Sequence, residues 1–180
     1  MVATRISVAE FEATCGDDRV ELIDGEIVPM APASMEPARV TMRLGALLTV
    51  HVMQHQLGDA FSAEAGFVMF EDRQTVVAPD VAFVRAGRLP QGEARWHFAR
   101  LVPDLVAEVI SPSDRPRDIA AKTALYQEAG VPLLWIMDPR AQAVTVLALG
   151  QEPVTLGIGD ELDGGEVLPE FRVAIAEIFA

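Results

Sequence analysis

Residues 104–114 read Asp-Leu-Val-Ala-Glu-Val-Ile-Ser-Pro-Ser-Asp, and residues 130–139 read Gly-Val-Pro-Leu-Leu-Trp-Ile-Met-Asp-Pro. The continuous apolar run at 133–137 is typical of a strand that is buried on both faces. The first stretch predicts another strand over 104–111, with a single carboxylate, Glu108, inside its apolar run. Two neighbouring buried strands therefore form the centre of the predicted fold.

A helix is predicted between these two strands. It begins after Ser113 or Asp114 and ends near Gly130. Pro116 is tolerated in its first turn, because a backbone amide at that position would have no partner within the helix. The sequence on either side predicts a mixed sheet with a helix on each side, in one α/β (α+β) domain over residues 1–180. The remaining predicted elements are helices at about 8–14, 38–56 and 173–179, strands at 61–70, 76–84 and 143–149, a hairpin turning at Asp24-Gly25, and β-hairpin material at 154–168.

Composition limits the class of protein. A hydrophobic share of 51% with 23% charged residues is typical of a globular domain, and no apolar run reaches the ~18 residues of a membrane span. The single cysteine, Cys15, and the absence of a signal-like N-terminus predict a cytoplasmic protein. The net charge of −13 argues against nonspecific binding of nucleic acid, although residues 85–122 carry seven bases against five acids.

Three residues suggest metal-assisted hydrolysis of a phosphodiester. Asp80 follows Pro79 at the start of one predicted strand, Glu108 lies within the next, and Lys122, the only lysine, lies in the helix that follows. An aspartate and a glutamate on neighbouring strands can bind one hard divalent cation, and the backbone carbonyl of Val109 could be a further ligand. A nearby lysine can orient a water or stabilise negative charge in the transition state.

Each of these residues also has a purely structural interpretation. Asp80 could belong to an ordinary turn, Glu108 could face water from an edge strand, and Lys122 could pair with Asp118 at i, i+4 spacing. Other features carry weaker signals: His51 and His55 have metal-compatible spacing without a third ligand, Cys15 has no nearby histidine, and Trp96 and Trp135 are predicted to be packing residues.

The combined motifs resemble the Uma family of predicted endonucleases, in the PD-(D/E)XK, restriction-endonuclease-like superfamily. The resemblance covers about residues 7–179 and is most specific over 104–139. Its motifs are Val-Glu-Leu-Ile-Asp-Gly-Glu (20–26), Ala-Pro-Asp-Val-Ala-Phe-Val (78–84), the two opening stretches, and Asp118, Lys122 and Tyr126 between them.

The resemblance implies a restriction-endonuclease-like core with an N-terminal hairpin and a C-terminal β extension. It implies that Asp80 and Glu108 bind Mg²⁺ or Mn²⁺, and that DNA is the substrate. In the superfamily the lysine lies two residues after the second acid, where this chain has Ile110; the family supplies it from the next helix, which matches Lys122. Glu21 matches an acidic position of the first hairpin and is a further candidate ligand of metal or water.

One departure from the family pattern leaves other functions open. Pro37 stands where family members commonly have a histidine at the start of the first core helix. With the net charge of −13, this favours two alternatives: a degenerate nuclease fold that binds or regulates, or a hydrolase of small phosphoesters. A homodimer is a further expectation, because cutting two strands takes two sites.

Overall fold

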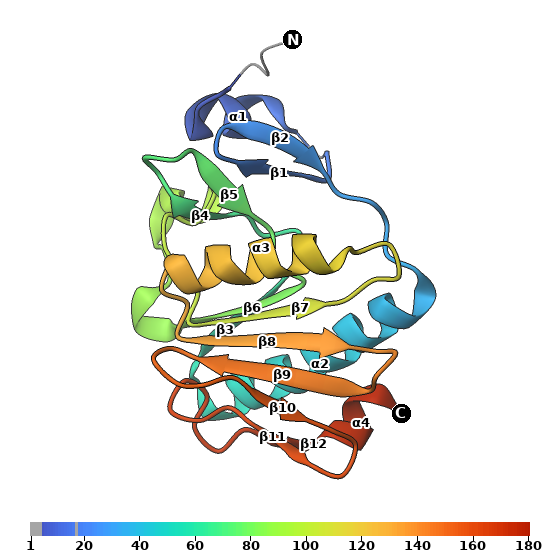
Figure 1. The fold of residues 1–180 in the computed structure, drawn as a ribbon. Helices are drawn as coiled ribbons and strands as arrows, with labels where there is room; N and C mark the ends of the chain where they lie inside the picture. The colour runs from blue at the N-terminus through green and yellow to red at the C-terminus, as the bar shows by residue number, and fades with distance from the viewer. Residues whose placement is uncertain (1–4, 17) are drawn as a thin grey trace.

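The computed structural model describes residues 5–16 and 18–180, and its largest element is a mixed six-stranded sheet (Figure 1). The strand order is β10-β9-β8-β7-β6-β3, in which β7 and β8 are parallel and the other neighbours are antiparallel. The mixed sheet predicted from the sequence is confirmed. Its strands are β3 (Gly58–Ser62), β6 (Val81–Arg85), β7 (Leu105–Val109), β8 (Leu133–Asp138), β9 (Ala143–Ala148) and β10 (Val154–Leu156).

Two long helices cover opposite faces of this sheet, α2 (Met35–His55) on one and α3 (Pro116–Glu128) on the other (Figure 1). Alternate strand residues enter the two cores, because side chains point to opposite faces of a strand. Leu105 and Ala107 pack in the core that α2 shares, whereas Val106 packs in the core with Leu125 and Tyr126 of α3. The prediction of a helix on each side is therefore confirmed.

A second sheet brings the N-terminal hairpin to the α3 side of the molecule. Its order is β2-β1-β5-β4, with β1 (Val20–Ile23), β2 (Glu26–Pro29), β4 (Phe67–Phe70) and β5 (Thr75–Val77), and α1 (Val8–Thr14) packs on it. Asp24 and Gly25 both have positive φ, 49° and 80°, as a two-residue hairpin turn requires. Ser7 and Glu10 form the predicted capping box of α1.

The predicted strands 61–70 and 76–84 were wrong as single elements. Each segment divides into two strands that belong to different sheets, β3 and β4 in the first case, β5 and β6 in the second. Gly66 lies at the first break, where an added Cβ would stand 2.4 Å from the Phe98 ring. Pro79 lies at the second break, because it has no amide to continue a ladder. Asp80 consequently lies at the junction of the two sheets.

Several element boundaries also differ from prediction. Helix α2 begins at Met35 and places Pro37 in its first turn, and it ends at Gln56, which adopts the left-handed conformation with φ of 54°. The predicted hairpin over 154–168 was wrong. Strand β10 pairs with β9, whereas β11 (Glu161–Asp163) pairs with β12 (Arg172–Ala174). Helix α4 (Ile175–Phe179) directly follows β12.

Between β6 and β7 the chain forms two short 3-10 helices, η1 (Ala86–Arg88) and η2 (Gly92–Trp96). The prediction that both tryptophans are packing residues holds for Trp135, which is fully buried, and is wrong for Trp96, whose side chain is 84% exposed. No helix within residues 5–16 and 18–180 combines the length and the apolar character needed to cross a membrane.

Candidate active site

Four predicted site residues from separate parts of the chain meet beside α3. Glu21 comes from β1, Asp80 immediately precedes β6, Glu108 lies in β7, and Lys122 lies in the middle of α3. Glu108 faces α3 because its neighbours Ala107 and Val109 occupy the opposite face of the strand. Glu21 approaches from the second sheet, which the hairpin extends over the same region.

The ammonium of Lys122 lies between two carboxylates. Its Nζ is 3.1 Å from Oε1 of Glu108 and 3.2 Å from Oε1 of Glu21. The side chains of Lys122, Glu108 and Glu21 are 29%, 15% and 9% exposed, respectively, so these ion pairs are largely screened from water. The alternative in which Lys122 pairs with Asp118 is wrong, since Asp118 instead contacts its neighbour Arg117.

Backbone amides hold the carboxylates of Asp80 and Glu21 in place. The amide of Val109 donates to Oδ2 of Asp80 at 2.8 Å, and the amide of Ala78 donates to Oε1 of Glu21 at 3.0 Å. Asp80 is thereby tied to the strand that carries Glu108. The role suggested for the Val109 carbonyl as a metal ligand stays a prediction; the contact made by this residue is through its amide.

Tyr126 is a site residue to which sequence reasoning assigned no role. Its hydroxyl donates to Oε1 of Glu108, the oxygen that also faces Lys122. The signal in the sequence was its position four residues after Lys122, which places both side chains on one face of the helix. The ring is fully buried in the core between α3 and the central sheet.

Burial and crowding of carboxylates determine the pKa values at the site. Burial raises the pKa of Glu108 to about 7, against the attraction of Lys122 and the Tyr126 hydrogen bond, and nearby Asp80 and Glu21 add to the rise. Burial likewise raises the pKa of Asp80. Burial alone would lower the pKa of Lys122, but its two carboxylate partners outweigh it and the net pKa is raised. The site therefore has a single positive charge, on Lys122, near three carboxyl groups.

Replacing Tyr126 by phenylalanine should move the pH dependence of the site upward. The hydroxyl stabilises ionised Glu108, so its loss should raise the pKa of Glu108 further above about 7. We expect the acidic limb of a pH profile of metal binding to shift upward by about one to two units, since a hydrogen bond to a charged group contributes about 1.5–3 kcal/mol. An unchanged limb would contradict the proposed contact.

The raised pKa of Glu108 should also make stability depend on pH. The folded protein keeps a proton on Glu108 that the unfolded chain releases above its ordinary pKa of 4.5. The stabilisation of the folded protein by this proton is complete below pH 4.5 and is lost as the pH rises through about 7. Glu108→Gln cannot ionise, so between pH 4.5 and about 8 it should lose about 3 kcal/mol less stability than the wild type in urea unfolding. Parallel curves for the two proteins would contradict this.

The donor set fits a divalent cation, although the side chains are not gathered as ligands. Among residues 5–16 and 18–180, no three Asp, Glu, His or Cys side chains are close enough together to hold a metal ion. Asp80, Glu108 and Glu21 nevertheless supply three largely buried carboxylates against a single lysine. A cation that prefers oxygen ligands would offset this excess of negative charge.

Other candidates lie away from this cluster. His51, His55 and Pro37 belong to α2, which covers the opposite face of the central sheet. The rings of His51 and His55 stack at 4.4 Å, and Nε2 of His51 contacts the carbonyl of Pro169.

Burial raises the pKa of Cys15, which disfavours a nucleophilic thiolate. Ile110 packs on the α3 side of the sheet, where Lys122 supplies the missing ammonium from the helix.

Comparison with known proteins identifies the family and the fold. Residues 8–176 match the model of the Uma2 family, described as “Putative restriction endonuclease”. The chain belongs to this family. A crystal structure described as “a putative nuclease belonging to DUF820 from Anabaena variabilis ATCC 29413” matches with a TM-score of 0.84 and 18% identity, covering 97% of each chain. This likeness confirms the nuclease fold of the Uma2 chain. A search of curated proteins found no match.

Proposed function

We propose that this Uma2 protein is a metal-dependent endonuclease of the PD-(D/E)XK type that hydrolyses DNA phosphodiester bonds. The observation that supports the proposal is the approach of Asp80, which precedes β6, to β7 with its Glu108, which pairs with Lys122 of α3. Membership of a family described as restriction endonucleases supports DNA as the substrate. A cytoplasmic location and a homodimer stay predictions.

Asp80 and Glu108 would hold Mg²⁺ or Mn²⁺, with Glu21 as an additional ligand of the metal or of a water. When bound, such a cation supplies neutralisation of phosphoryl charge and a water of lowered pKa. Lys122 keeps its proton throughout, because two carboxylates raise its pKa. Its ammonium is therefore a fixed positive charge that can stabilise the negative charge that develops on the phosphoryl oxygens during hydrolysis.

Glu108 has a second role in this proposal, as the group that sets the working pH. A carboxylate must be ionised to bind a cation, so protons compete with metal below its pKa of about 7. Tyr126 donates to the same oxygen that faces Lys122 and limits the rotation of the carboxylate. The proposed enzyme therefore works best at neutral to alkaline pH.

Nicking of supercoiled plasmid, measured over a range of salt concentrations, is the experiment that tests the proposal. We expect conversion to the open circle with Mn²⁺ or Mg²⁺, its loss on chelation, and a rate that rises with pH through about 7. Salt is varied because it screens both the repulsion between DNA and a protein of net charge −13 and any local attraction to basic side chains. Turnover of a small phosphodiester without nicking would favour the small-phosphoester alternative, and no turnover of either substrate would favour a binding module.

A further inference from the structure

The two tryptophans have opposite environments, and only one of them has a structural task. Trp135 is fully buried in the central core, whereas the side chain of Trp96 is 84% exposed at the end of η2. A solvated indole costs free energy, since apolar surface is left in water. The exposed indole of Trp96 can therefore stack against a ligand.

Trp96 borders a cavity of about 430 Å³ that is lined by aromatic and apolar side chains and by Glu12, Glu64, Arg95 and His97. This volume lies within the range of small-molecule sites. Phe61 and Phe67 meet edge to face in its wall, with ring centroids 5.7 Å apart. The other apolar side chains that line it include Leu89, Pro90, Phe98 and Leu101.

The segment that carries Trp96 is fixed to α1 and has a basic rim. The amide of Phe98 donates to Oε1 of Glu12 at 2.6 Å, and Nδ1 of His97 lies 3.3 Å from the same oxygen. Arg95 is 60% exposed and reaches Asp59 only at 3.9 Å, so its guanidinium is available to another anion. An aromatic face beside a loosely held arginine suits a planar group attached to a phosphate.

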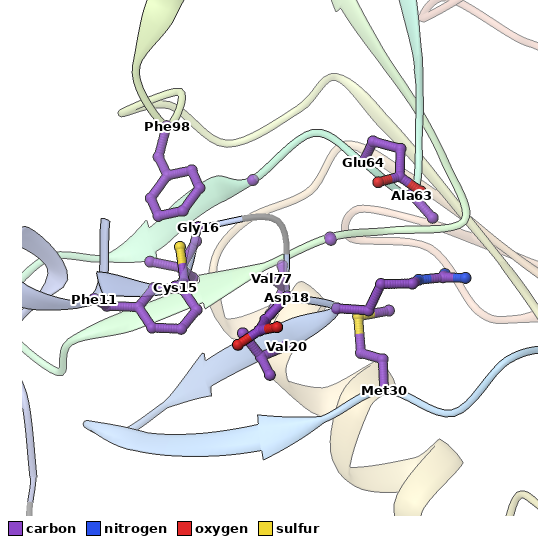
Figure 2. A pocket seen from close by; sticks show the side chains of 14 residues that line it. Phe11, Cys15, Gly16, Asp18, Val20, Met30, Ala63, Glu64, Val77 and Phe98 are labelled. Atoms are coloured by element: carbon purple, nitrogen blue, oxygen red, sulfur yellow. The ribbon is translucent and has the colours of Figure 1, made fainter. Parts of the chain in front are cut away.

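A second cavity adjoins this one. It has a volume of about 320 Å³ and shares Cys15, Gly16, Glu64, Gly66 and Phe98 with the first. Figure 2 shows Phe98 above Cys15 at one end of this cavity, and the acidic side chains of Asp18 and Glu64 also line it. Its lining reaches Ala78, whose amide donates to Glu21 of the site.

We propose that Trp96 and the cavity below it bind an unpaired nucleobase of the strand that is cleaved. The identity of this ligand rests on the proposed nuclease function. The base stacks on the indole, and Arg95 contacts an adjoining phosphate. A single aromatic group with a charged rim fits one base better than a protein partner, for which a broader apolar surface is expected.

Binding of a thymidine oligonucleotide, measured in chelator so that cleavage cannot occur, tests this site. Because Trp135 is buried, Trp96 is the exposed fluorophore, and we expect the oligonucleotide to quench it. Trp96→Ala should weaken binding roughly 5- to 100-fold, the range for loss of one stacked base. An abasic oligomer of equal length keeps the phosphates and should bind the wild type and Trp96→Ala alike. Met53→Ala, at another exposed apolar residue, is the matched control.

Three results would overturn the proposal: affinity of Trp96→Ala within twofold of the wild type, equal quenching by the abasic oligomer, or quenching by protein concentration alone, which would assign Trp96 to contact with a second copy. Plasmid nicking separates this inference from the nuclease proposal. Trp96-dependent binding without nicking would uphold the base site and reject the nuclease. Nicking with Trp96-independent binding would reject the base site alone.

Discussion

Lys122→Met is expected to reduce plasmid nicking by at least about 100-fold, the loss typical of removing one group that stabilises charge in a transition state. Methionine keeps much of the length of the lysine side chain but has no charge. Glu21 and Glu108 would then face each other without the ammonium that lies 3.2 and 3.1 Å from them. Removing one partner of buried ion pairs also costs about 3–5 kcal/mol of stability, so the fold must be measured alongside nicking.

Lys122→Arg separates the catalytic role of Lys122 from its structural role. Arginine keeps a positive charge between the two carboxylates, so we expect most of the stability to be retained. Its planar, delocalised guanidinium cannot present the compact charge of an ammonium at the same point, so nicking should still fall by about 10-fold or more. Nicking by folded Lys122→Met at a rate near that of the wild type would show that Lys122 is only structural.

Asp80→Asn and Glu108→Gln should each reduce nicking by about 100-fold or more at saturating DNA, because each removes one negative charge from the proposed cation site. A loss of about 3 kcal/mol in transition-state stabilisation corresponds to this factor. Both substitutions keep the shape of the side chain. In Asp80→Asn, the carboxamide oxygen can still accept the hydrogen bond from the amide of Val109.

Asp118→Asn is the matched control for these two variants. Asp118 is an exposed acid on the same helix as Lys122, four residues before it, and its ion pair is with Arg117. We expect nicking within about twofold of the wild type, because Asp118 is exposed and pairs with Arg117 outside the cluster. Loss of such an exposed charge also changes stability little. A loss comparable to that of Glu108→Gln would mean that total negative charge near α3, and not the cluster itself, determines activity.

The centre of the fold was predictable because its signals are local. The apolar runs of β7 and β8 and the polar helix between them follow from residues 104–139 alone. The splitting of segments 61–70 and 76–84 was not predictable from periodicity. Both halves of each segment are apolar, and only the second sheet, built from distant strands, determines where one ends.

Glu108 and Lys122 could be proposed as site residues because both lie in that central block, whereas Asp80 lies outside it, immediately before β6. Family motifs indicate Glu21, which approaches them through the pairing of β1 with β5. Tyr126 was assigned no role because a buried tyrosine in a helix is ordinarily a core residue, and its hydrogen bond to Glu108 depends on the tertiary arrangement. The exposure of Trp96 was missed for the same reason: tryptophan usually packs.

The central claim is that Asp80 and Glu108 hold a divalent cation, and calorimetric titration of Mn²⁺ tests it most directly. At about pH 8, where Glu108 is largely ionised, the wild type should bind the metal with measurable heat. Asp80→Ala and Glu108→Ala should each lose this binding while remaining folded, and Asp118→Asn should keep it. Equal binding by the wild type and both alanine variants, or no binding by the wild type at millimolar Mn²⁺, would contradict the metal-dependent nuclease.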